Sequence, residues 1–168
     1  MPLVFSASGW SDEPKLEETV VVASRISDRI DRLGVSGNLI DRAEIESHGY
    51  PDVASLLDTQ TGVGITTNGA FSKAASARIR GEEGFRTRVL LDGINIADPS
   101  SSQISLRMEH LLTNGLSKIE VLRGPSGLVW GADAGGVILL STISDATERE
   151  FTASLEGGSD GYNRATAN

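Results

Sequence analysis

Two apolar runs around a glycine-rich segment constrain the fold of this chain more than any other feature. Lys118 to Leu122 alternates as a β-strand does, and Gly136 to Ile143 reads as a second, continuous apolar strand. The segment between them lacks the Gly-Lys-Ser/Thr and Gly-x-Gly-x-x-Gly patterns of phosphate-binding loops. We therefore expect the glycines to allow close turns and tight backbone packing, where side chains would collide.

Capping signals predict two short helices earlier in the chain. Asp41 and Glu44 form an Asp-x-x-Glu helix start, and Gly49 lies where that helix should end. Asp52 is placed to cap a second helix, whose apolar face is formed by Val53, Leu56 and Leu57. Asp92-Gly93, between two apolar runs, predicts a two-residue β-hairpin. The predicted fold class is α+β: a small mixed β-sheet with short helices and long loops.

Composition excludes several classes of function. The 168 residues suffice for one ordinary domain, and 15 basic against 23 acidic residues give a net charge of −8, which disfavours a nucleic-acid partner. The absence of cysteine removes disulfides, zinc–thiolate sites and thiol catalysis. No stretch approaches the ~20 apolar residues of a membrane-spanning helix.

No group of residues has the pattern of a catalytic or metal site. His48 and His110 have no carboxylate or histidine at metal-ligand spacing, and no Gly-x-Ser-x-Gly motif occurs. Asp92 and Asp98 could be paired as acid and base, but the hairpin explains Asp92 better. We predict that the chain is not an enzyme and needs no cofactor.

Arginines gather in one part of an otherwise acidic chain. Arg78, Arg80, Arg86 and Arg88 lie within eleven residues, and Arg123 follows later. Strand alternation would put Arg78 and Arg80 on one face, where carboxylates should meet them. The alternative is a solvated basic edge that discourages strand pairing.

The two ends of the chain differ from the middle in their pattern of apolar and polar residues. After Glu150 the chain alternates apolar and polar residues, resuming after a turn at Tyr162; this is typical of membrane β-barrel strands, although a soluble hairpin reads similarly. The pattern stops at Asn168, which suggests a fragment. The first ten residues resemble either the remnant of a signal peptide or a frayed terminus.

Five segments in order resemble the plug domain of TonB-dependent outer-membrane receptors. They are ETVVVAS, DVASLLDTQTGVGI, IRG at Ile79 to Gly81, VLLDGINI at Val89 to Ile96, and IEVLRGP followed by WGADAGGVI. The resemblance runs from about Glu17 to Ser144. It departs from the family at Trp130, where a tyrosine is usual, and within VILLSTIS, where an asparagine and a lysine are common.

The resemblance implies a domain that occludes a large barrel and helps bind a scarce nutrient. It divides the chain into a leader (1–16), a TonB-box segment (17–25), a plug (26–148) and the beginning of a barrel (149–168). The box would add as a strand to the TonB C-terminal domain, which suits an isolated β-branched run on a flexible leader with no local partner strand; the alternative is a strand of the plug's own sheet. Its residues are Glu18, Thr19, Val20, Val21, Val22, Ala23 and Ser24.

Other positions gain expected roles from the same resemblance. Arg80 and Arg123 match the arginines that anchor a plug to glutamates of its own outer-membrane barrel. Outward-facing loops expected to contact substrate contain Asn68, Phe71, Ser72, Asp98, Ser100 and Ser101. The expected substrate is cobalamin or a ferric siderophore, with a weak preference for cobalamin. The implied location is the outer membrane, with the N-terminus toward the periplasm. The alternative function is a free-standing soluble module that binds a ligand or another protein.

Overall fold

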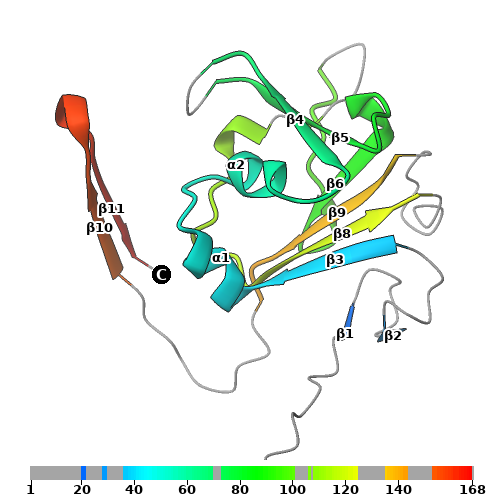
Figure 1. Cartoon of the computed structure of the whole chain (residues 1–168), viewed down its shortest axis with the longest axis horizontal. Helices are drawn as coiled ribbons and strands as arrows, with labels where there is room; N and C mark the ends of the chain where they lie inside the picture. Colours follow the sequence, from blue (N-terminus) through cyan, green and yellow to red (C-terminus); the bar gives the residue numbers. More distant parts are fainter. Residues whose placement is uncertain are drawn as a thin grey trace, which may run out of the picture.

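The computed structural model describes residues 20–21, 28–29, 36–69, 73–100, 106, 108–124, 135–143 and 153–167. Its centre is a five-stranded mixed sheet with the strand order β3-β8-β9-β6-β7 (Figure 1). These strands are β3 (Ser36–Asp41), β6 (Thr87–Leu91), β7 (Ile94–Asn95), β8 (Lys118–Arg123) and β9 (Gly136–Ser141). The α+β class predicted from the sequence is confirmed.

The sheet is antiparallel except at one pair of strands. β8 pairs antiparallel with both β3 and β9, whereas β9 pairs parallel with β6. The two apolar runs that frame the glycine-rich segment therefore lie side by side. Residues 125–134, where the close turns are predicted, lie outside the described residues. β3 pairs with β8 alone and forms one edge of this sheet.

Both predicted helices form, with the predicted caps. In α1 (Arg42–His48), the Asp41 carboxylate accepts a hydrogen bond from the Glu44 amide at 2.8 Å, and Gly49 ends the helix with a φ of 64°. In α2 (Val53–Asp58), the Asp52 carboxylate accepts from the Ser55 amide at 2.8 Å. Among the described residues, no helix has the length and apolar character needed to cross a membrane.

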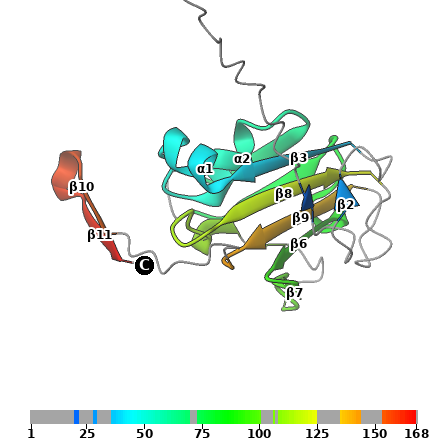
Figure 2. The same ribbon diagram turned by 90° about the horizontal axis from the view of Figure 1, so that it is seen from below.

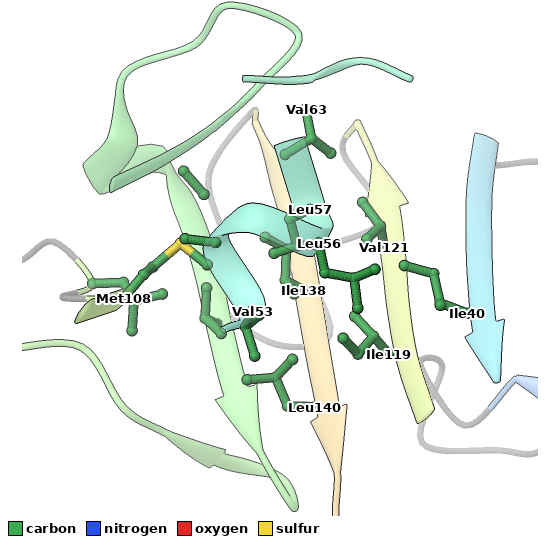
Figure 3. Close-up of a cluster of buried hydrophobic side chains, with 14 of the residues drawn as sticks. Ile40, Val53, Leu56, Leu57, Val63, Met108, Ile119, Val121, Ile138 and Leu140 are labelled. Carbon is green, nitrogen blue, oxygen red and sulfur yellow. The ribbon is translucent and has the colours of Figure 1, made fainter. Parts of the chain in front are cut away.

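The core lies between α2 and one face of the sheet. Both helices are on that face (Figure 2). Leu56 and Leu57 are fully buried, and the side chains of Ile119, Val121 and Ile138 form the facing layer (Figure 3). This is the amphipathic arrangement that the apolar spacing of the second helix predicts. Met108, in a 3₁₀ turn at Met108–His110, closes one side of the cluster.

The hairpin predicted at Asp92-Gly93 is also confirmed. Asp92 and Gly93 have positive φ values of 47° and 82°, as a type I′ turn requires of its two central residues. The Asp92 carboxylate has a second role, because it accepts hydrogen bonds from the Thr142 amide at 2.8 Å and the Thr142 hydroxyl at 2.7 Å. Asp92 therefore joins the β6–β7 turn to the residues that follow β9.

Among the described strands, three antiparallel pairs lie outside the main sheet. β4 (Val63–Thr67) pairs with β5 (Ala75–Ile79), and β10 (Ala153–Gly157) pairs with β11 (Asn163–Ala167). In the β10–β11 hairpin, Leu155 is 86% exposed. The third pair is short and joins β1 (Val20–Val21) to β2 (Asp28–Arg29). The hairpin predicted from the C-terminal alternation is thus present.

Candidate functional site

Arg80 occupies an unusual backbone conformation directly after β5. It has a φ of 55° and is followed by Gly81 at 76°, while the Glu82 amide donates to the Ile79 carbonyl at 3.1 Å. Because β5 ends at Ile79, the expected alternation of Arg78 and Arg80 along one strand is wrong. The chain turns at Arg80 instead.

The left-handed backbone conformation of Arg80 requires stabilising contacts from neighbouring residues. A non-glycine residue in this region costs about 1–2 kcal/mol, and such strain is concentrated at functional sites. Here the Arg80 amide donates to the carbonyl of Gly62 at 2.9 Å. Its guanidinium lies against Gly124, since a β-carbon added there would be 3.3 Å from Arg80 Nη1. The side chain itself is exposed.

Arg123 ends β8 and is buried, with 9% of its surface exposed. Its Nη1 donates to the Ser36 hydroxyl at 3.0 Å. The buried Nε and Nη2 atoms have no hydrogen-bond partner among the described residues. The guanidinium packs on Gly62, where an added β-carbon would lie 3.2 Å from Nε.

The fold thus brings the two predicted anchoring residues to one place. The Gly62 carbonyl accepts a hydrogen bond from the Arg80 amide, and the Arg123 guanidinium packs on Gly62. The Arg80 guanidinium packs in turn on Gly124, the residue after Arg123. Side chains at either glycine would crowd an arginine. We call Arg80 and Arg123, with these two glycines, the arginine site.

Neighbouring arginines find carboxylates within the chain, whereas the arginine site does not. Arg78 lies 3.7 Å from Glu83, and Arg86 lies 3.7 Å from Glu82. Within the parts of the chain that the structure describes, neither Arg80 nor Arg123 forms an ion pair. Glu82 and Glu83, the acidic residues nearest to Arg80 in sequence, pair with Arg86 and Arg78. Glu120, the acidic residue nearest to Arg123, pairs with Lys118.

The arginine site is chemically suited to carboxylates. A guanidinium presents donors in a planar fork that matches the two oxygens of a carboxylate, and buried donors without acceptors are costly. Two such groups, packed on the neighbouring glycines Gly62 and Gly124, favour an acidic partner over a neutral one. Among the described residues, no group of three or more histidine or acidic side chains could hold a metal ion.

The predicted TonB-box segment is described only at Val20 and Val21. These residues pair with Arg29 and Asp28 in a separate two-stranded sheet and not with the five-stranded sheet. The expectation that this run has no local partner strand is therefore wrong. Glu18, Thr19, Val22, Ala23 and Ser24 lie outside the described residues.

The predicted substrate-facing residues are described in part. Phe71, Ser72 and Ser101 lie outside the described residues, as does Trp130. The Asn68 amide donates to Ala74 in the β4–β5 turn, and the Asp98 carboxylate accepts from the Ser100 amide at 2.8 Å. Among the described residues, no hydrogen bond joins Asn68 to Asp98 or Ser100.

Sequence reasoning missed Ser36, which contacts Arg123 from a position 87 residues away. It also missed the side chain of Asn38, which donates to Gln60 at 3.0 Å, near Gly62. Both residues lie on one face of β3, two positions apart. The available signal was polar residues at alternate positions just before the apolar pair Leu39 and Ile40.

The described fold is that of a small α+β domain with a mixed sheet, and its candidate site holds two arginines suited to binding carboxylates. The family model of the TonB-dependent receptor plug domain matches residues 30–138. The chain belongs to this family.

Curated relatives agree with this assignment. The vitamin B12 transporter BtuB of Vibrio vulnificus strain YJ016 is 29% identical over 154 residues, which cover 90% of this chain and 25% of the transporter. The chain thus spans about a quarter of the length of the curated relatives it matches. These relatives are transporters, which does not favour a free-standing module or an enzyme.

Solved receptors share the fold. The alcaligin outer-membrane receptor FauA from Bordetella pertussis superimposes with a TM-score of 0.68 at 19% identity, covering 94% of this chain and 27% of FauA. The ferric-catecholate import receptor Fiu from E. coli K12 gives a TM-score of 0.59 at 24% identity, covering 79% of this chain and 18% of Fiu.

Proposed function

We propose that this chain is the plug of an outer-membrane active transporter. It occludes a barrel, contributes to nutrient binding and takes part in TonB-driven uptake of cobalamin or a ferric siderophore. Its membership of the plug family and its similarity to BtuB support the proposal. The observation that carries it is the arginine site, where two neighbouring arginines form no ion pair among the described residues.

In this proposal Arg80 and Arg123 bind carboxylates on the inner wall of the barrel. Such pairs resist separation, since removing one partner of a buried pair leaves an uncompensated charge and costs about 3–5 kcal/mol. The stability of these arginine–carboxylate pairs also depends on their geometry, because both charges lose their stabilisation when the two groups move apart. A plug held in this way stays in place at rest and can still be displaced by an applied force.

Retention by a barrel tests the anchoring role. The barrel of the Vibrio vulnificus vitamin B12 transporter, without its own plug, is immobilised in detergent and this chain is added. We expect the chain to be retained, and the double variant Arg80→Ala/Arg123→Ala to be lost. Arg123→Lys should be retained less well, because an ammonium group lacks the fork.

The matched control for retention is Arg78→Ala/Arg86→Ala. It removes the same charge from arginines that already pair with Glu83 and Glu82. We expect it to be retained like the wild type. Equal loss from both double variants would show that net charge, and not the arginine site, holds the chain.

We also propose that Glu18 to Ser24 is the TonB box. In the whole chain, binding would first release Val20 and Val21 from Asp28 and Arg29, a pair of two-residue strands that is only marginally stable. A labelled peptide of residues 17–25 should bind the TonB C-terminal domain in fluorescence anisotropy. Val21→Pro should abolish binding, because proline removes a ladder hydrogen bond. Equal binding of both peptides would exclude strand addition.

The loops that contain Asn68, Phe71, Ser72, Asp98, Ser100 and Ser101 are proposed to face the nutrient. In the transporter they would lie on the outer side and the N-terminus would face the periplasm. Cobalamin and a ferric catecholate siderophore, each added to the barrel-bound chain, distinguish the two substrate classes by their absorbance. Alanine substitutions in these loops should weaken binding of one class and leave retention by the barrel unchanged.

A further inference from the structure

One side chain among the described residues, that of Ser36, hydrogen-bonds the Arg123 guanidinium. Among the described residues, the only hydrogen bond from this group is that from Nη1 to the Ser36 hydroxyl at 3.0 Å. The bond joins residues 87 positions apart, and it lies at the end of the β3–β8 ladder, where Ser36 is opposite Arg123. The contact therefore exists only while the first residue of β3 is paired.

β3 is an edge strand of the main sheet, and Ser36 is its first residue. The strand pairs only with β8 (Figure 1). Ser36 is exposed and is the first described residue after the segment that contains β1 and β2. A force applied to the chain before Ser36 reaches the ladder at this residue first.

A second contact links β3 to the turn at Gln60 to Gly62, on which the Arg123 side chain packs. Asn38 Nδ2 donates to Gln60 Oε1 at 3.0 Å, and Gln60 precedes Gly62 by two residues. Gly62 is the residue on which the Arg123 guanidinium packs. The beginning of β3 thus contacts both the guanidinium and the loop beneath it.

We infer that Ser36 is a positioning residue that couples β3 to the Arg123 guanidinium. While β3 is paired, the Ser36 hydroxyl holds Nη1, and Nε and Nη2 keep a fixed orientation. When the start of β3 leaves β8, the guanidinium loses this restraint and its geometry toward a carboxylate. The inference rests on the proposed function, in which Arg123 anchors the plug and TonB pulls the preceding segment.

Exchange of the Arg123 guanidinium protons with water, followed by NMR in the full 168-residue chain, tests the coupling. In Ser36→Ala we expect exchange about tenfold faster, the factor for one hydrogen bond of ordinary strength. Ser36→Thr keeps a hydroxyl and should exchange like the wild type. Ser117→Ala, which removes hydroxyl contacts near the other end of β8, should leave Arg123 unchanged.

Exchange in low urea tests whether β3 opening releases the arginine. The Arg123 guanidinium protons and the β3 amides should open together, before the amides of β8 and β9. The coupling is overturned if Ser36→Ala leaves Arg123 exchange unchanged, or if the guanidinium protons open only with β8 and β9. Both exchange experiments use the chain without a barrel, so they test the coupling alone. Retention by the barrel tests the anchoring role, and either proposal can therefore fail without the other.

Discussion

Gly136→Ala should be among the most damaging single-methyl additions in this domain. A β-carbon at Gly136 would lie 2.2 Å from the Leu122 carbonyl oxygen and 3.3 Å from Arg123 Cα. Both are backbone atoms of β8, so a side-chain rotation cannot relieve the contact. Gly136 also has a φ of 140°, a conformation that residues with side chains rarely adopt.

The expected loss of stability has two parts. The backbone conformation costs alanine about 1–3 kcal/mol, and forcing an extra methyl group into a packed region costs another 1–3 kcal/mol or so. The sum of about 2–6 kcal/mol is a large share of the 5–15 kcal/mol that typically stabilises a domain. We expect urea unfolding, followed by circular dichroism, to show a midpoint far below that of the wild type.

Gly64→Ala is the matched control, because an added β-carbon there meets nothing within 4 Å. Its unfolding midpoint should stay close to the wild-type value or rise slightly, since alanine restricts the unfolded chain. If Gly136→Ala unfolds at the same urea concentration as Gly64→Ala, the close approach of β8 and β9 at Gly136 is wrong.

Three further predictions concern other parts of the domain. Asp92→Ala removes both hydrogen bonds to Thr142 and should speed hydrogen exchange of the Thr142 amide about tenfold or more, as mass spectrometry or NMR would show. Arg80→Gly relieves the left-handed backbone and should stabilise the chain by about 1 kcal/mol in thermal unfolding while weakening barrel retention; a lower Tm would contradict the strain argument. Leu57→Ala, at a fully buried position, should cost about 2–5 kcal/mol in urea unfolding, whereas Leu155→Ala, at a position 86% exposed, should change stability by less than about 0.5 kcal/mol.

The parts of this fold that were predicted from the sequence depend on neighbours in the chain. The caps at Asp41 and Asp52 act on amides three residues away, and the Asp92-Gly93 turn requires only the conformations of two adjacent residues. The apolar spacing of the second helix likewise predicts its buried face. These signals are local, so a single sequence contains them.

Strand order and the detail of the arginine site were not predicted, because they depend on distant pairings. Periodicity does not select β8 as the partner of β3. Periodicity also predicts that β5 continues through Arg80, because the alternation of residues does not indicate the left-handed conformation that ends the strand there. The resemblance to the plug family selected Arg80 and Arg123, but their meeting around Gly62 needed the three-dimensional structure.

The position of β9 has a consequence for the order in which the domain can fold. β9 is the last strand of the main sheet in sequence, yet it lies between β8 and β6. Until it is present, the β3–β8 and β6–β7 pairs have no strand to connect them. Because the parallel β6–β9 pairing joins distant segments, sheet closure should be slow compared with formation of the local hairpins. A chain cut before Gly136 could not assemble the sheet, because it would lack the strand that joins its two halves.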